Sequence, residues 1–401
     1  MTATMGSQDM AANSRSRRAF WSTGLAIFAM FFGAGNIVFP LTLGQFTEDQ
    51  TVFGILGLII TAVFVPLTGL LAMLIYEGDY TSFFQRIGKI PGFLVIVAIL
   101  GLIGPLGGIP RCITISFSTL EAFHLPALNW LSLSIFSTFT CSLLFLFTYR
   151  PRRILSLLGY ILTPLLLIAL ACIVGKGLWT MPKLEQVSHT GWEAFTRGLL
   201  DGYNTLDLLA AFFFSSIVLL CLRKNHGEKT LGEKKSMLAV AITGSLIAAT
   251  LLTFVYVCFA FLAAGHSTEL KSIASDQLLG TLAQKILGSH AGLVATVLVC
   301  FACFTTEIAL TAIFAEFLQK TLFKGKISYP LALAFTLLVA FLVSTLHFSG
   351  ISAFLVPVVQ ICYPALIVLS LVNIFYKLYG FKPVKTLFYG TMAITLVAYL
   401  L

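Results

Sequence analysis

The chain has 401 residues, of which 58% are hydrophobic and only 10% are charged. Its mean hydropathy of +0.97 lies far above that of water-soluble proteins, which excludes a soluble globular domain. The formal net charge of +9 does not indicate nucleic-acid binding, because the basic residues are spread over several short segments. We therefore expect an all-α polytopic protein of the lipid bilayer.

Apolar stretches of about 20 residues, long enough to cross a bilayer, follow one another along nearly the whole chain. They predict eleven membrane-spanning helices, at residues 20–44, 53–76, 92–120, 130–148, 154–177, 194–221, 237–264, 290–318, 328–346, 351–376 and 386–401. The uncharged run 327–376 is divided at the polar stretch 347–350. The last span ends with the chain, which fits either an eleven-span protein or one that lacks a twelfth span present in relatives.

Lysine and arginine are divided unevenly between the two sides of these spans. Short cytoplasmic loops carry the excess of basic residues. With the tail 1–18 in the cytoplasm, nineteen of the 25 basic residues fall on the cytoplasmic side, five fall on the other side, and Arg111 lies inside the third span. The sequence thus predicts a multi-pass protein of the cytoplasmic (inner) membrane with a cytoplasmic N-terminus.

The first and sixth spans are each interrupted by small and polar residues. The first contains Gly33-Ala34-Gly35-Asn36, followed by Pro40, and the sixth contains Asp-Gly-Tyr-Asn-Thr-Leu-Asp at 201–207. Glycines are also common where membrane helices pack closely, so the first interruption alone favours neither interpretation. The first and sixth spans are the first helices of two five-span units, 19–177 and 192–376, and 386–401 is an additional span. Paired breaks at matching positions indicate the inverted repeat of secondary transporters.

Broken helices of this kind have a direct chemical use. The N-terminus of a half-helix presents unpaired amides to a carboxylate, while the freed carbonyl oxygens can coordinate a cation. A zwitterionic amino acid and a coupling ion suit such a site. The sequence contains no nucleotide-binding or hydrolase motif, which favours a gradient as the energy source. We expect no cofactor, no catalytic residues and no obligatory protein partner, with a passive channel and a membrane-embedded enzyme as alternatives.

Four segments carry a resemblance to a known family: Phe-Phe-Gly-Ala-Gly-Asn-Ile-Val-Phe-Pro (31–40), Gly-Pro-Leu-Gly-Gly-Ile-Pro-Arg (104–111), Asp-Gly-Tyr-Asn-Thr-Leu-Asp (201–207) and Ala-Glu-Phe (315–317). In this order they resemble the bacterial BrnQ-type branched-chain amino acid:cation symporters (LIVCS) of the LeuT-like APC superfamily. The resemblance implies a LeuT-like fold of two inverted five-span repeats. It also implies symport of leucine, isoleucine or valine with sodium or protons, and methionine stays an alternative substrate because the side-chain pocket is not identified.

The resemblance further implies two sets of site residues. The substrate site would consist of Gly33, Ala34, Gly35 and Asn36 around the carboxylate, facing Gly202, Tyr203 and Thr205, with Asp207 at the acidic position of the family. The cation site would combine the hydroxyls of Thr305 and Thr306 with the carbonyls of Ala29, Phe32 and Ala302. Alternatively, both threonines bond back to carbonyls of their own helix, as is common in membrane helices.

Two charged residues inside the spans add a further hypothesis. Glu307 stands where the carrier family usually has a small residue, and a buried carboxyl is unfavourable unless it is paired or protonated. Glu307 could therefore bind the proton that couples transport, or it could neighbour a sodium site. Arg111 is the candidate ion partner of Glu307, with a purely structural ion pair as the alternative.

Overall fold

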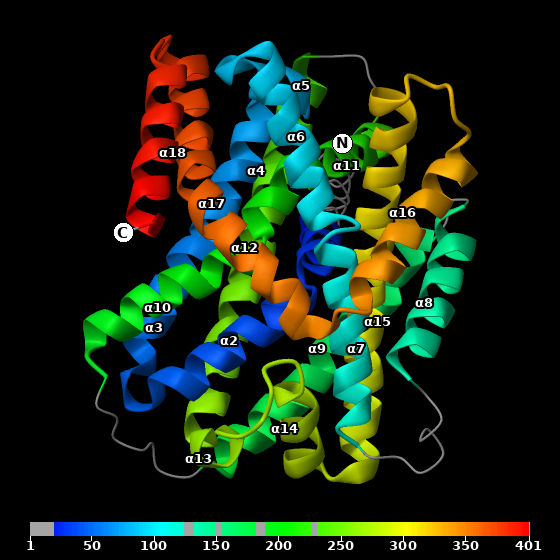
Figure 1. Ribbon diagram of the computed structural model, residues 1–401, viewed down its shortest axis with the longest axis vertical. Helices are drawn as coiled ribbons and strands as arrows, with labels where there is room; N and C mark the ends of the chain where they lie inside the picture. The colour runs from blue at the N-terminus through cyan, green and yellow to red at the C-terminus, as the bar shows by residue number, and fades with distance from the viewer. Residues whose placement is uncertain (1–19, 124–131, 150–153, 182–188, 227–230, 401) are drawn as a thin grey trace, which may run out of the picture.

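The computed structural model describes residues 20–123, 132–149, 154–181, 189–226 and 231–400. The predicted N-terminal tail, 1–18, lies outside these residues. Every regular element in the described part of the chain is a helix, and many of these helices run along the long axis of the molecule (Figure 1). This agrees with the predicted all-α class, because a helix satisfies its own backbone hydrogen bonds in lipid.

Five described segments are long and apolar enough to cross a membrane: Ala34–Ile75, Lys89–Glu121, Leu238–Gly265, Ser289–Leu322 and His347–Tyr379. Six shorter apolar helices accompany them, among them Phe20–Phe31 and Val384–Leu400. Several of the shorter ones are halves of interrupted or closely spaced segments, so the number of crossings does not follow from helix length alone.

The first half of the chain contains the helix Phe20–Phe31, α2 (Ala34–Thr47), α3 (Thr51–Ile59), a π-helical turn (Ile60–Phe64), α4 (Val65–Ile75), α5 (Tyr80–Phe84), α6 (Lys89–Ile103), α7 (Gly108–Glu121), α8 (Leu133–Thr148) and α9 (Ile154–Trp179). The predicted span 92–120 lies within the apolar segment Lys89–Glu121, but its helix is interrupted, because the chain leaves the helix between α6 and α7. A Cβ atom on Gly108 would lie 1.9 Å from the carbonyl oxygen of Ile103. Only glycine permits this close approach.

The second half contains α10 (Gly191–Tyr203), α11 (Asp207–His226), α12 (Leu231–Gly265), α13 (Ser267–Leu270), α14 (Leu278–Leu287), α15 (Ser289–Phe317), α16 (Tyr329–Ser344), α17 (His347–Tyr379) and α18 (Val384–Leu400). Helices α13 and α14 lie between the predicted spans 237–264 and 290–318. The turn between α16 and α17 lies at 345–346, earlier than the predicted 347–350. His347, with φ of 58°, is already the first residue of α17.

At several glycines, the interrupted helices approach the backbone of a neighbouring helix closely. A Cβ atom on Gly57 of α3 would lie 2.2 Å from the carbonyl oxygen of Phe195 in α10, and one on Gly198 would lie 2.0 Å from that of Gly54. Gly44 of α2 approaches the backbone of Ala260 in α12 in the same way. Small residues of this kind allow membrane helices to pack backbone to backbone. Both broken spans are thus fixed in the interior by direct helix contacts.

Candidate functional site

The first break lies between the helix Phe20–Phe31 and α2. Gly33 has an extended backbone with φ −125° and ψ −160°, and its amide donates a 3.0 Å hydrogen bond to Oδ1 of Asn36. The first turn of α2 therefore begins in the interior of the protein, where its amide groups and the positive end of the helix dipole can face a ligand. This confirms the break that the glycine-containing motif predicts.

The second break lies between α10 and α11, at residues 204–206. Leu206 has φ of 66°, a left-handed conformation that is uncommon for a residue with a side chain. Thr205 Oγ1 donates to the carbonyl of Gly202 at 2.9 Å, and the amide of Leu208 donates to the hydroxyl of Tyr363 at 3.0 Å. These bonds satisfy backbone groups that the interruption leaves without helical partners.

The two breaks touch each other. A Cβ atom on Gly35 would lie 2.9 Å from both the Cα atom and the carbonyl oxygen of Thr205, so a larger residue would push the broken spans apart. Nδ2 of Asn36 donates to Oδ2 of Asp207 at 2.6 Å and also contacts the hydroxyl of Tyr256. The same Tyr256 hydroxyl donates to Oδ2 of Asp207 at 3.0 Å. Three helices, α2, α11 and α12, therefore meet in one buried polar cluster.

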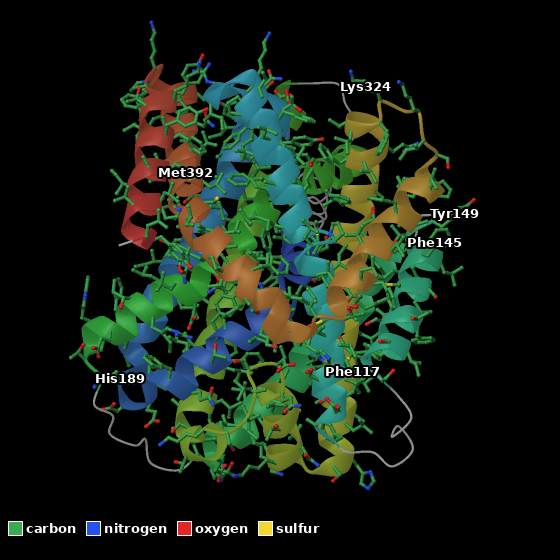
Figure 2. The ribbon with its side chains drawn as sticks, viewed as in Figure 1. Phe117, Phe145, Tyr149, His189, Lys324 and Met392 are labelled. Atoms are coloured by element: carbon green, nitrogen blue, oxygen red, sulfur yellow. The ribbon has the colours of Figure 1, made fainter. Side chains whose placement is uncertain are left out.

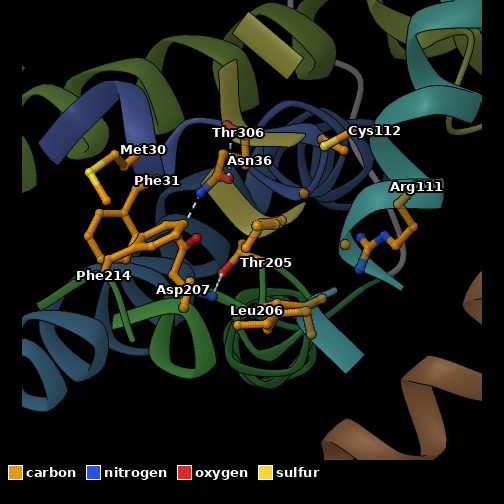
Figure 3. A pocket seen from close by; sticks show the side chains of 17 residues that line it. Met30, Phe31, Asn36, Arg111, Cys112, Thr205, Leu206, Asp207, Phe214 and Thr306 are labelled. Atoms are coloured by element: carbon orange, nitrogen blue, oxygen red, sulfur yellow. Dashed lines mark hydrogen bonds between the residues drawn. The ribbon is translucent and has the colours of Figure 1, made fainter. Parts of the chain in front are cut away.

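A cavity of about 40 Å³ lies where the breaks meet (Figure 3). One part of its wall is apolar and includes Met30, Phe31 and Phe214, and the rings of the two phenylalanines pack edge to face at 5.4 Å. Another part carries Asp207 and Arg111. The volume holds about three water molecules, which is less than a branched-chain amino acid requires.

Six of the eight predicted substrate-site residues line this cavity: Gly33, Ala34, Gly35, Asn36, Thr205 and Asp207. The other two, Gly202 and Tyr203, face elsewhere. Gly202 packs against Thr61 in the π-helical turn, where an added Cβ atom would lie 1.9 Å from the threonine hydroxyl. The Tyr203 ring packs on Tyr363 with a centroid distance of 4.7 Å.

The five predicted cation-site residues are also neighbours, with one distinction between the threonines. Thr306 Oγ1 lies 3.5 Å from the carbonyl oxygen of Ala29, 3.3 Å from that of Phe32 and 3.4 Å from that of Ala302. Thr305 Oγ1 instead donates to Ala302 of its own helix at 2.7 Å. A hydroxyl can donate only one hydrogen bond, so three carbonyl oxygens converge on a single donor at Thr306.

Arg111 and Glu307 are both buried, with 3% and 1% of their surfaces exposed. No ion pair joins them in the described part of the chain, so the predicted Arg111–Glu307 pair is not formed. Nη1 of Arg111 donates to the carbonyl of Asn204 at 3.0 Å. The Oε2 atom of Glu307 has no hydrogen-bond partner among the described residues.

Two tyrosines of the site carry no signal in the sequence. Tyr256 completes the polar cluster around Asp207, and Tyr363 supports the start of α11. Each is a single tyrosine in an apolar helix, a common feature of membrane spans, and neither lies beside a glycine or a charge. Only the packing of α12 and α17 against the breaks reveals what their hydroxyls contact.

Two helices that are broken in mid-span and meet at an interior cavity are typical of secondary transporters. The family described as "Branched-chain amino acid transport protein" matches residues 16–401. The chain belongs to this family. It is 29% identical over 372 residues to the branched-chain amino acid permease BraB of Bacillus subtilis (strain 168), covering 89% of this chain and 80% of the permease.

Solved structures support the same fold. The inward-facing conformation of Mhp1 superimposes with a TM-score of 0.64 at 14% identity and covers 95% of this chain and 84% of Mhp1. A Na⁺-coupled sialic acid symporter in a substrate-bound outward-open state gives a TM-score of 0.52 at 13% identity, over 95% of this chain and 90% of that symporter. The chain is therefore a multi-pass membrane transporter of LeuT-like fold rather than an enzyme.

Proposed function

We propose that the chain is a secondary active symporter that imports leucine, isoleucine or valine across the cytoplasmic membrane by alternating access, driven by a sodium gradient. The observation that carries this proposal is the cavity between the two breaks. Asn36 and Asp207 give it a polar side, while Phe31 and Phe214 give it an apolar wall, which together suit an amino acid with an aliphatic side chain.

The small volume of the cavity supports alternating access. A branched-chain amino acid could enter only if the surrounding helices moved apart. The segment around α13 bridges two of these helices, because Gln45 of α2 donates to the carbonyl of Leu270 at 2.5 Å and Ser118 of α7 donates to Asp276 at 2.6 Å. We expect these two hydrogen bonds to break when the site opens toward the end of the molecule at which α13 lies.

Sodium is favoured as the coupling ion by the oxygen atoms around Thr306. Sodium is a hard cation, which prefers hydroxyl and carbonyl oxygens, and three carbonyls already converge on this hydroxyl. Thr305 belongs to the proposed site as the neighbouring hydroxyl. The alternative coupling ion is a proton, favoured by the buried and incompletely bonded carboxyl of Glu307.

The test is uptake of labelled leucine into proteoliposomes under an inward sodium gradient or an inward proton gradient, with unlabelled isoleucine, valine and methionine as competitors. We expect sodium-driven accumulation that persists in Glu307→Ala and is inhibited by isoleucine and valine. Proton-driven uptake that disappears in Glu307→Ala would make the carboxyl the coupling group. Absence of leucine accumulation under both gradients would overturn the branched-chain assignment. Stronger inhibition by methionine than by valine would instead identify methionine as the preferred substrate.

A further inference from the structure

Arg111 is held rigidly in the interior by three parts of the fold. Its guanidinium lies over the ring of Phe39 in α2 at 5.0 Å and over the ring of Phe348 in α17 at 5.5 Å. Nη1 donates to the carbonyl of Asn204 in the break of span six at 3.0 Å. Such ring contacts favour a cation and restrict the plane of the guanidinium.

One edge of this guanidinium has no partner. Neither Nε nor Nη2 donates a hydrogen bond to any group in the described residues, although both atoms are buried. A buried donor without a partner is unfavourable, and more so when the group is charged. The Nε–H bond and one Nη2–H bond point in the same direction, and this pair matches the two oxygens of a carboxylate in a bidentate contact. The edge left without a partner is thus the one suited to a carboxylate.

The free edge belongs to a residue that lines the cavity, and Asp207 lines the same cavity. Figure 3 shows the two side chains reaching it from different helices, α7 and α11. No ion pair within 4.0 Å joins them in the part of the chain that the structure describes. The guanidinium of Arg111, which extends from α7, lies at the C-terminal end of α10, where it bonds to the carbonyl of Asn204. Asp207 is the first residue of α11. A basic group at a helix C-terminus and an acidic group at a helix N-terminus each complement the helix dipole. The cavity is therefore lined by one basic and one acidic side chain.

We propose that Arg111 binds the carboxylate of the transported amino acid through Nε and Nη2, together with the N-terminal amides of α2, while Asp207 binds the ammonium group. This inference rests on the proposed function and adds the orientation of the substrate to it. The ionic groups of a zwitterion would then satisfy the two opposite charges of the cavity, and its side chain would extend toward Phe31 and Phe214. A molecule that lacks either ionic group would leave one of these charges without a partner.

A purely structural role for Arg111 makes different predictions. If the guanidinium served only to bind the carbonyl of Asn204, its loss would disturb the break of span six and weaken all ligands equally. Lysine could retain a positive charge at that position, but it lacks the planar two-donor edge. The dependence of affinity on the chemical groups of the ligand therefore distinguishes the two roles.

The experiment uses the purified full chain in lipid nanodiscs at saturating sodium, with isothermal titration of three ligands. The ligands are leucine, leucinol, which lacks the carboxylate, and 4-methylvalerate, which lacks the ammonium group. The proteins are the native chain, Arg111→Gln, Arg111→Lys and the control Arg86→Gln. Arg86 lies in the turn Gln85–Ile87 between α5 and α6 and packs over the ring of Tyr376 at 3.5 Å, and it does not line the cavity.

We expect the native chain and Arg86→Gln to bind leucine much more tightly than leucinol. In Arg111→Gln, leucine and 4-methylvalerate should each weaken by at least about thirtyfold, the lower range for removing one partner of a buried charge pair, while leucinol is unaffected. Arg111→Lys should lie between the native chain and Arg111→Gln for leucine. If Arg111→Gln does not fold, as judged by its elution and unfolding temperature, Arg111→Lys decides the question by the same ratio of leucine to leucinol affinity.

The inference is overturned if Arg111→Gln binds leucine as the native chain does, if all three ligands weaken by one common factor, or if native leucine and leucinol affinities are equal. These outcomes leave the proposed function intact as long as the native chain binds and accumulates leucine. Failure of the native chain itself to bind leucine would remove the proposed function and this inference together.

Discussion

Thr305 and Thr306 are neighbours in the sequence, yet their hydroxyl groups have different partners. Thr306 reaches across to Ala29 and Phe32 of the first span, whereas Thr305 bonds within its own helix. The two substitutions Thr306→Val and Thr305→Val have the same size and remove the same group, so they form a matched pair.

We expect Thr306→Val to raise the sodium concentration that gives half-maximal leucine uptake by about tenfold, which corresponds to a loss of about 1.4 kcal/mol of binding free energy. Thr305→Val should raise it less, because its hydroxyl already bonds to Ala302. The measurement is uptake into proteoliposomes as a function of external sodium. Two outcomes would contradict the assignment of Thr306 to the cation. One is an equal effect of both substitutions, and the other is a Thr306→Val variant with unchanged sodium dependence and weakened leucine affinity at saturating sodium.

Glu307 allows a second test with an isosteric change. Glutamine has nearly the same shape as a protonated glutamate but cannot release a proton, and the Oε2 atom that it replaces has no hydrogen-bond partner among the described residues. If sodium alone drives transport, we expect Glu307→Gln to change sodium-driven leucine uptake by less than about tenfold. Uptake under a proton gradient that is present in the native chain and absent in Glu307→Gln would instead make this residue the carrier of the coupling proton.

The residues of the site differ in how well the sequence identifies them. Asn36 and Asp207 are visible because polar side chains in an apolar helix are unfavourable without a function. Tyr256 bonds to both of them and remains invisible, since a tyrosine suits a membrane helix with or without a partner. Arg111 is conspicuous in the sequence, but the predicted partner Glu307 is not the group that it contacts, because the direction of a side chain depends on the packing of three helices.

Glycines at helix contacts give a prediction for the packing of whole elements. Gly57 and Gly198 bring α3 and α10 so close that an added Cβ atom would overlap a backbone carbonyl. Gly175 of α9 has no heavy atom within 4 Å of such a Cβ position, so Gly175→Ala is a matched control for Gly57→Ala.

We expect Gly57→Ala to destabilise the protein by about 1–3 kcal/mol, the range found for overpacking. Gly175→Ala should be neutral or stabilising by up to about 1 kcal/mol, because alanine favours a helix more than glycine does. The measurement is the unfolding temperature of the purified protein in one detergent. Equal unfolding temperatures for the two variants would show that α3 and α10 can separate without loss of stability.

The breaks in spans one and six were predictable because each combines glycine with polar residues inside an apolar stretch. The break between α6 and α7 was not predicted, although Gly104, Pro105, Gly107 and Gly108 are all present in the sequence. A proline or glycine in a membrane helix is usually accommodated without a break, because neighbouring groups satisfy the freed backbone. Here the backbone folds back within five residues, so that Gly108 approaches the carbonyl oxygen of Ile103. Glycines that allow such a turn look the same in the sequence as glycines that only let membrane helices pack closely.

Charge is also distributed unevenly over the whole molecule. Lys324 lies at the end where α5 begins, and α13 and α14 lie at the opposite end (Figures 1 and 2). The sequence predicts that most of the basic residues in connecting segments lie on the side of Lys324 and that this side faces the cytoplasm. The inverted arrangement of the two repeats remains a prediction, whereas the orientation can be tested on a single helix.

Helix α15 and the π-helical turn after it extend from Ser289 to Leu322, 34 residues, or about 50 Å at 1.5 Å per residue. This exceeds the hydrocarbon thickness of about 30 Å, so exposed residues just beyond its two ends should lie on opposite sides of the membrane. His290, in its first turn, and Lys324, after its last, are both exposed. They are suitable positions for single cysteine substitutions.

We expect Lys324→Cys to react with a membrane-impermeant maleimide in inverted vesicles only, and His290→Cys to react in right-side-out vesicles only. The native chain is the blank, because its described cysteines lie within the apolar helices. The reverse pattern would place the basic end outside and overturn the predicted cytoplasmic N-terminus. Reaction of both positions from one side would mean that α15 does not cross the membrane, in which case Thr306 could not contribute to a transport pathway at the centre of the bilayer.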